Sequence, residues 1–62
     1  MNLKKMCEEK GIDFKILSAK SGISLTYIYE LQRGAKNNPS VQVVKKLASA
    51  LGVDTNRLLD TA

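Results

Sequence analysis

The sequence predicts an all-α domain of five short helices. Three observations point to this fold class: apolar residues recur at helical spacing, a glycine follows each of the first four periodic segments, and no segment alternates between apolar and polar residues over the length of a strand. None of the segments is long enough to be stable alone, so burial between them must hold the domain together. The expected helices cover residues 3–10, 14–21, 25–33 and 41–51, with a short fifth helix through Leu58 and Leu59.

Each expected helix begins after a residue whose side chain can cap its free backbone N–H groups, and the first four end at a glycine. In chain order the predicted capping residues are Asn2, Asp13, Ser24, Ser40 and Asp54, and the predicted terminators are Gly11, Gly22, Gly34 and Gly52. The side chains that share one helical face in these segments predict the core. They are Leu3, Met6 and Cys7, then Phe14, Leu17 and Ser21, then Ile28 and Leu31, and last Val41, Val44, Leu47, Ala48 and Leu51.

Composition excludes several classes of function. The chain has 62 residues, which is enough for one domain, and it has no histidine and one cysteine, Cys7. An internal disulfide, a Cys/His metal cluster and nucleophilic catalysis by a Ser-His or Cys-His pair are therefore excluded. The formal net charge of +4 and a pI near 9.5 suggest a polyanionic partner, although ordinary surface lysines would give the same balance.

The second and third expected helices are joined by Ser21-Gly22-Ile23-Ser24. A glycine in a short turn between two amphipathic helices is the pattern of a helix-turn-helix, here over about residues 14–33. The glycine permits a left-handed turn, the isoleucine fills the angle between the helices, and Leu17 and Ile28 fix their crossing. This crossing would project the outer face of the third helix, and a single α-helix fits the DNA major groove, which is about 12 Å wide.

Over about residues 3–60 the chain resembles the Cro/C1-type (XRE-like) helix-turn-helix family. The resemblance implies that residues 1–62 form one lambda-repressor-like domain whose third helix enters the major groove, often as a two-fold dimer. The stretches that carry it are Glu8-Glu9-Lys10-Gly11-Ile12, Leu17-Ser18-Ala19-Lys20-Ser21-Gly22-Ile23-Ser24, Ile28-Tyr29-Glu30-Leu31-Gln32-Arg33-Gly34, Asn38-Pro39-Ser40, Leu47-Ala48-Ser49-Ala50-Leu51-Gly52-Val53 and Leu58-Leu59.

Four departures from the family pattern bear on function. Where the family usually opens its second helix with a Gln that touches the DNA backbone, this chain has Phe14, and where it often has a small Ala, this chain has Ser18. The family's Arg–Glu pair between the first and third helices corresponds to Cys7 and Gln32. Because replacing both partners of a buried ion pair can be neutral, we expect a smaller neutral contact there.

The fourth departure concerns the base-reading positions, which in the family are often Gln, Asn, Arg or Ser. The matching residues here are Leu25, Thr26, Tyr29 and Glu30. Thr26 could offer its methyl and hydroxyl to a base edge, or be an ordinary exposed residue. Leu25 could pack on thymine methyls or within the domain, and Tyr29 could reach a base or pack at the domain edge. Glu30 could accept from cytosine, or be a surface charge paired with Arg33.

Other residues are expected to face the DNA backbone on either side of the groove. The free N–H groups of the second and fourth helices would assist them, and such contacts fix register without reading sequence. The expected backbone contacts are Phe14, Lys15, Ser24, Tyr27, Arg33, Lys36, Asn37, Asn38 and Ser40. Ile16 falls off the buried face, and Val53, Leu58 and Leu59 could close the core or, with Arg57, form a dimer seam.

The sequence thus favours a small double-stranded-DNA-binding transcriptional regulator, with repressor activity the simplest form, acting as a homodimer in the cytoplasm. The alternative is a protein-interaction module on the same fold, such as an antitoxin-like or anti-repressor partner. The third helix carries no Lys or Arg before Arg33, which favours this alternative, and Leu25, Tyr27 and Tyr29 would then form its interface. We expect no enzymatic activity, no cofactor, no metal, no small-molecule ligand and no membrane association.

Overall fold

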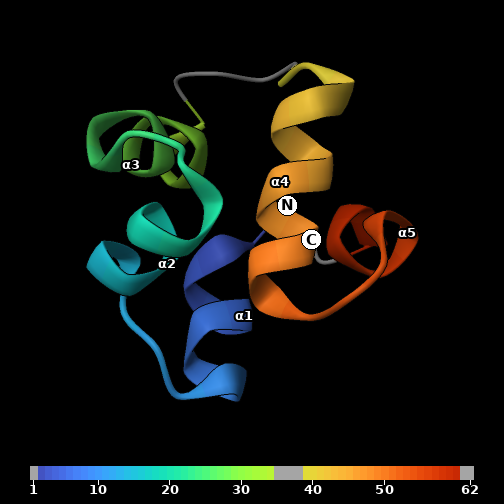
Figure 1. Cartoon of the computed structure of the whole chain (residues 1–62), viewed down its shortest axis with the longest axis horizontal. Helices are drawn as coiled ribbons and strands as arrows, with labels where there is room; N and C mark the ends of the chain where they lie inside the picture. The colour runs from blue at the N-terminus through green and yellow to red at the C-terminus, as the bar shows by residue number, and fades with distance from the viewer. Residues whose placement is uncertain (1, 35–38, 61–62) are drawn as a thin grey trace.

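The computed structural model describes residues 2–34 and 39–60, and all its helices lie where the sequence predicts them. In Figure 1, α2 and α3 lie on one side of α4, and α5 lies on the other. No strand occurs in the described ranges, so the all-α prediction is confirmed. The helices are α1 (Leu3–Lys10), α2 (Phe14–Ser21), α3 (Leu25–Arg33), α4 (Val41–Leu51) and α5 (Thr55–Asp60).

The predicted caps are all in place. Each capping side chain accepts a hydrogen bond from the backbone N–H three residues further along the chain, which satisfies one of the free donors of the first helical turn. The glycines that follow α1 to α4 all have a left-handed backbone, as predicted. The cap distances are 3.0 Å for Asn2, 2.8 Å for Asp13, 3.1 Å for Ser24, 3.2 Å for Ser40 and 2.7 Å for Asp54.

All five helices contribute to one hydrophobic core. The largest side chains that are fully buried are Leu3 and Met6 of α1, Leu17 of α2, Ile28 of α3, Leu47 of α4 and Leu58 of α5. Cys7 and Ser21 are also buried, as the helical spacing predicts. Because each helix is too short to persist alone, the loss of any one of these contacts weakens the whole domain.

Val41 and Leu59 are among the large hydrophobic residues that lie outside this core, as are Ile16 and Tyr29. Val41 was expected on the inward face of α4, yet it is 70% exposed, because it is the first residue of that helix and lies beyond the edge of the core. Leu59 is 55% exposed, whereas its neighbour Leu58 is fully buried. Adjacent residues on a helix point about 100° apart, so only one of the two can face the core.

The described residues hold neither a membrane-spanning helix nor a metal-binding cluster. No helix in the described ranges has the length and apolar character needed to cross a membrane. Within the same ranges, no three His, Cys, Asp or Glu side chains are grouped as they would be around a metal ion.

Candidate nucleic-acid interface

Side chains of α2 hold the turn that leads into α3. The backbone of Gly22 is left-handed, with φ +75°, and its N–H donates to the Ser18 carbonyl at 2.9 Å. The Ser18 hydroxyl donates to the Ile23 carbonyl at 2.6 Å, and the Ile23 N–H donates to the Ser21 hydroxyl oxygen at 3.1 Å. Both polar backbone groups of Ile23 are therefore satisfied before α3 begins, which fixes the angle between the two helices.

The sequence predicted only part of this turn. Ile23 is half-buried and packs against the core, as expected of the residue that fills the angle. The two serine hydrogen bonds were not predicted, since the sequence shows Ser18 only as a departure from the family's Ala. The available signal was the position of the two hydroxyls, five and two residues before Ile23, since Ser side chains commonly bond to nearby backbone.

The crossing of α2 and α3 divides α3 into an inner and an outer face. Leu17 and Ile28 are both fully buried where the helices meet, and Leu31 extends the inner face. The outer face carries Thr26, Tyr29 and Arg33, which are exposed. The helix-turn-helix unit predicted for residues 14–33 therefore presents one solvent-facing ridge of side chains.

The expected base-reading residues differ in exposure. Thr26 is exposed and Tyr29 is 51% exposed, whereas Leu25 and Glu30 are half-buried. Within the described residues, no ion pair joins Glu30 to Arg33. Thr26 and Tyr29 are thus the two of the four candidates that the fold presents most openly.

The expected backbone-contacting residues also separate into groups. Four of them, Lys15, Ser24, Arg33 and Ser40, are exposed. The two serine oxygens accept from their own helices, which leaves each hydroxyl hydrogen available to donate to a phosphate oxygen. Phe14 and Tyr27 are half-buried against the core, and Lys36, Asn37 and Asn38 lie outside the described residues.

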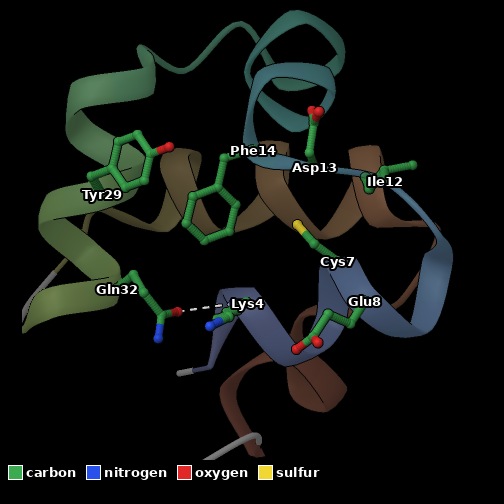
Figure 2. A pocket seen from close by; sticks show the side chains of 8 residues that line it. All are labelled: Lys4, Cys7, Glu8, Ile12, Asp13, Phe14, Tyr29 and Gln32. Atoms are coloured by element: carbon green, nitrogen blue, oxygen red, sulfur yellow. Dashed lines mark hydrogen bonds between the residues drawn. The ribbon is translucent and has the colours of Figure 1, made fainter.

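A pocket of about 440 Å³ lies beside α3, next to α1 and the start of α2 (Figure 2). Gln32 is tied to α1 here, since the Lys4 backbone N–H donates to its Oε1 at 2.9 Å. The expected neutral contact therefore joins Gln32 to the backbone of α1, while Cys7 is buried at the same site. The lining residues are Lys4, Cys7, Glu8, Ile12, Asp13, Phe14, Tyr29 and Gln32.

The Cys7 thiol of this pocket is buried beside a carboxylate. Burial raises the pKa of the Cys7 thiol, and the nearby Asp13 carboxylate raises it further, so the thiol is held in its neutral form.

Two aromatic rings that line the pocket are in contact. The ring of Phe14 packs edge-on against the ring of Tyr29, with centroids 5.2 Å apart and an interplanar angle of 68°. The exposed Tyr29 is therefore in contact with the first residue of α2.

Two short helices joined by a left-handed turn, with the second helix presenting an exposed outer face, define a helix-turn-helix domain. The family model described as helix-turn-helix matches residues 3–58. The chain belongs to this helix-turn-helix family, which confirms the family resemblance seen in the sequence.

Several curated proteins are similar to the chain. It is 38% identical to the HTH-type transcriptional regulator SlrR of Bacillus subtilis, over 86% of this chain and 35% of that protein. It is 33% identical to the HTH-type transcriptional regulator SinR of Bacillus subtilis, over 94% of this chain and 52% of that protein. An uncharacterized HTH-type transcriptional regulator, y4dJ of Sinorhizobium fredii, is 40% identical over 84% of this chain and 66% of its own length. The chain thus spans between about a third and two thirds of these relatives, and no solved structure gives a significant match.

Proposed function

We propose that the chain binds double-stranded DNA and regulates transcription, most simply as a repressor, by docking α3 in the major groove. The observation that carries this proposal is the fixed crossing of α2 and α3, which leaves the outer face of α3 unoccupied by the rest of the fold. A single helix of this kind fits the groove, and the helix before it crosses the DNA backbone. In this arrangement Thr26 contacts a base edge.

Charge and helix ends support the same docking. Lys15 and Arg33 are exposed at the start of α2 and at the end of α3, where they would flank the groove. The Ser24 and Ser40 hydroxyls lie at two helix N-termini, which favour phosphate. The net charge of +4 favours association with a polyanion. We further propose a homodimer in the cytoplasm that places two α3 helices about 34 Å apart, in successive major grooves.

Selection of bound duplexes from a random pool, at two salt concentrations, tests this proposal. The expected result is one enriched sequence, with an affinity that falls steeply as salt rises because bound cations are released from the phosphates. Titration of the labelled protein with that duplex should shift the amide signals of residues 24–34. Recovery of no sequence would refute the proposal, and so would unshifted signals over α3 on titration with the selected duplex.

Two variants separate base reading from backbone contact. Thr26→Ala should weaken binding by about 1–3 kcal/mol and relax the preference at one base pair, because it removes a base-edge contact. Lys15→Ala should weaken all duplexes alike and lower the slope of log affinity against log salt by about one, because it removes a phosphate contact. Lys5→Ala, at an exposed position on α1, is the matched control with little expected effect. Equal losses for Thr26→Ala on selected and scrambled duplexes would remove Thr26 from the base-reading set.

The second candidate function is a protein-interaction module. The observation that favours it is the exposed Tyr29, which lies beside Phe14 at the rim of a pocket. An aromatic interface of this kind would bind a protein partner with little dependence on salt. The two-salt experiment therefore also decides between the candidates, since only phosphate binding weakens steeply with added salt.

A further inference from the structure

Phe14 is the first residue of α2, the helix that would cross the DNA backbone in a docked helix-turn-helix. Its side chain has no donor or acceptor, so it cannot hydrogen-bond to a phosphate oxygen. It is half-buried, packs against the core and lies edge-on to Tyr29, with ring centroids 5.2 Å apart. Its ring partner Tyr29, on the next helix, carries a phenol hydroxyl, which is a hydrogen-bonding group of the kind that Phe14 lacks.

Tyr29 is both exposed and held. It is 51% exposed on the outer face of α3, yet its ring rests against the first residue of α2. Figure 2 shows the Tyr29 ring extending from α3 with its hydroxyl on the side where α2 begins, and the Phe14 ring beside it. An aromatic pair in this edge-on geometry is favourable beyond the area that it buries, so the pair restricts the rotation of Tyr29.

In a docked helix-turn-helix, the side of α3 that faces α2 lies next to the sugar-phosphate backbone of the DNA. The second helix of the motif lies in the groove, while the first helix crosses the sugar-phosphate backbone. A side chain of α3 that is held against the start of α2 is therefore held toward the backbone and away from the base edges. A phenol hydroxyl in that position can donate to a phosphate oxygen, a contact that fixes register without reading sequence.

We propose that Phe14 is a positioning residue that holds Tyr29 for a contact with the DNA backbone, so that the Tyr29 hydroxyl donates to a phosphate oxygen and does not read a base. This inference rests on the proposed function, and it changes the roles of two residues. Phe14 acts through Tyr29 and makes no hydrogen bond to DNA. Tyr29 leaves the base-reading set, and Thr26 is then the most exposed residue that remains in it.

A double-mutant cycle on DNA affinity tests this division of roles. The variants are Tyr29→Phe, which removes the hydroxyl and keeps the ring pair, Phe14→Leu, which keeps an apolar side chain and removes the ring, and the two together. Fluorescence anisotropy is measured with the selected duplex and with duplexes in which each base pair is changed in turn. Thermal unfolding of each variant shows that it is folded at the temperature of the measurement.

Tyr29→Phe should lower the affinity about fivefold, by the same factor on every duplex, because a backbone hydrogen bond is lost. The salt slope should stay unchanged, because a neutral hydroxyl releases no counterion. Phe14→Leu should lower the affinity about threefold when Tyr29 is present and have almost no further effect in the Tyr29→Phe background. Nuclear Overhauser contacts between the two rings should be present in the unmutated protein.

Three results would overturn the inference alone. A loss confined to particular base pairs for Tyr29→Phe would make Tyr29 a base reader. An equal loss for Phe14→Leu in both backgrounds would show that Phe14 acts independently of the hydroxyl. An absence of Nuclear Overhauser contacts between the two rings in the unmutated protein would show that Phe14 does not position Tyr29. This measurement does not depend on whether the variants fold. If the unmutated chain bound no duplex, the proposed function itself would fail, and that outcome is seen before any variant is compared.

Discussion

The turn between α2 and α3 depends on the left-handed backbone of Gly22. A substitution there measures the energetic cost of that backbone conformation alone, because the added side chain would meet no other atom. The φ of Gly22 is +75°, and a Cβ built there meets no other atom within 4 Å. The substitution Gly22→Ala therefore introduces backbone strain and no clash. A side-chain-bearing residue of ordinary handedness in this conformation costs about 1–2 kcal/mol.

The expected change in melting temperature follows from the size of the chain. At about 2.1 cal/mol/K per residue, unfolding of 62 residues carries an entropy of about 130 cal/mol/K. A loss of 1 kcal/mol then lowers the melting temperature by about 8 °C, so Gly22→Ala should lower it by about 8–15 °C. Thermal unfolding followed by far-UV circular dichroism measures this directly.

A D-alanine at position 22, introduced by chemical synthesis of the chain, is the matched control. Its preferred backbone is the mirror image of that of L-alanine, so a φ of +75° is unstrained for it. It should stabilise the domain by about 0.4–1 kcal/mol, because it restricts the unfolded chain more than glycine does. If the D- and L-alanine variants were destabilised equally, the space around Gly22 would be closed and the reasoning would be wrong. An unaffected L-alanine variant would show that the turn is not left-handed.

Three further predictions concern the core and the turn. Ser18→Ala should cost about 1–3 kcal/mol in urea unfolding, because a partly buried carbonyl of the turn loses its donor; Ser49→Ala, at an exposed position, should cost little. Leu47→Ala should cost about 2–5 kcal/mol, because the side chain is fully buried, whereas Val41→Ala, at a 70% exposed position, should change the unfolding free energy by less than about 0.5 kcal/mol. The pKa of the Cys7 thiol is raised in the folded state. The neutral thiol therefore contributes fully to the unfolding free energy at pH values below the pKa of the unfolded thiol, and this contribution is lost as the pH rises through the pKa of the folded thiol. The unfolding free energy should therefore fall less steeply at alkaline pH in Cys7→Ala, and identical slopes would contradict the burial of the thiol.

The helix boundaries could be predicted because they depend on local chemistry. A capping side chain such as Ser24 and a terminator such as Gly34 act within one helical turn, so neither requires knowledge of the rest of the fold. The helical spacing of apolar residues likewise identifies the inner face of each helix. It does not show where the core ends, and this is why Val41 was placed inside when it is exposed.

The contacts between helices could not be predicted in the same way. The hydrogen bond from the Lys4 N–H to Gln32 joins residues 28 positions apart, and the ring pair of Phe14 and Tyr29 also depends on the packing of two helices. For Gln32 the sequence indicated that a neutral contact replaces the family's charged pair, but not which atom of α1 it would meet. The candidate site residues were predicted from the resemblance to a family. The structure adds which of them are exposed and which are packed against the core.

The separation of the two faces of α3 divides stability from the proposed recognition of DNA. Ile28 and Leu31 are buried and anchor the helix from within, while Thr26 is exposed on the outer face. An exposed residue can be exchanged at small thermodynamic expense, so under the proposed function variation at position 26 would change the preferred duplex while the scaffold persists. A library randomised at this site would be expected to yield mostly folded members with diverging preferences.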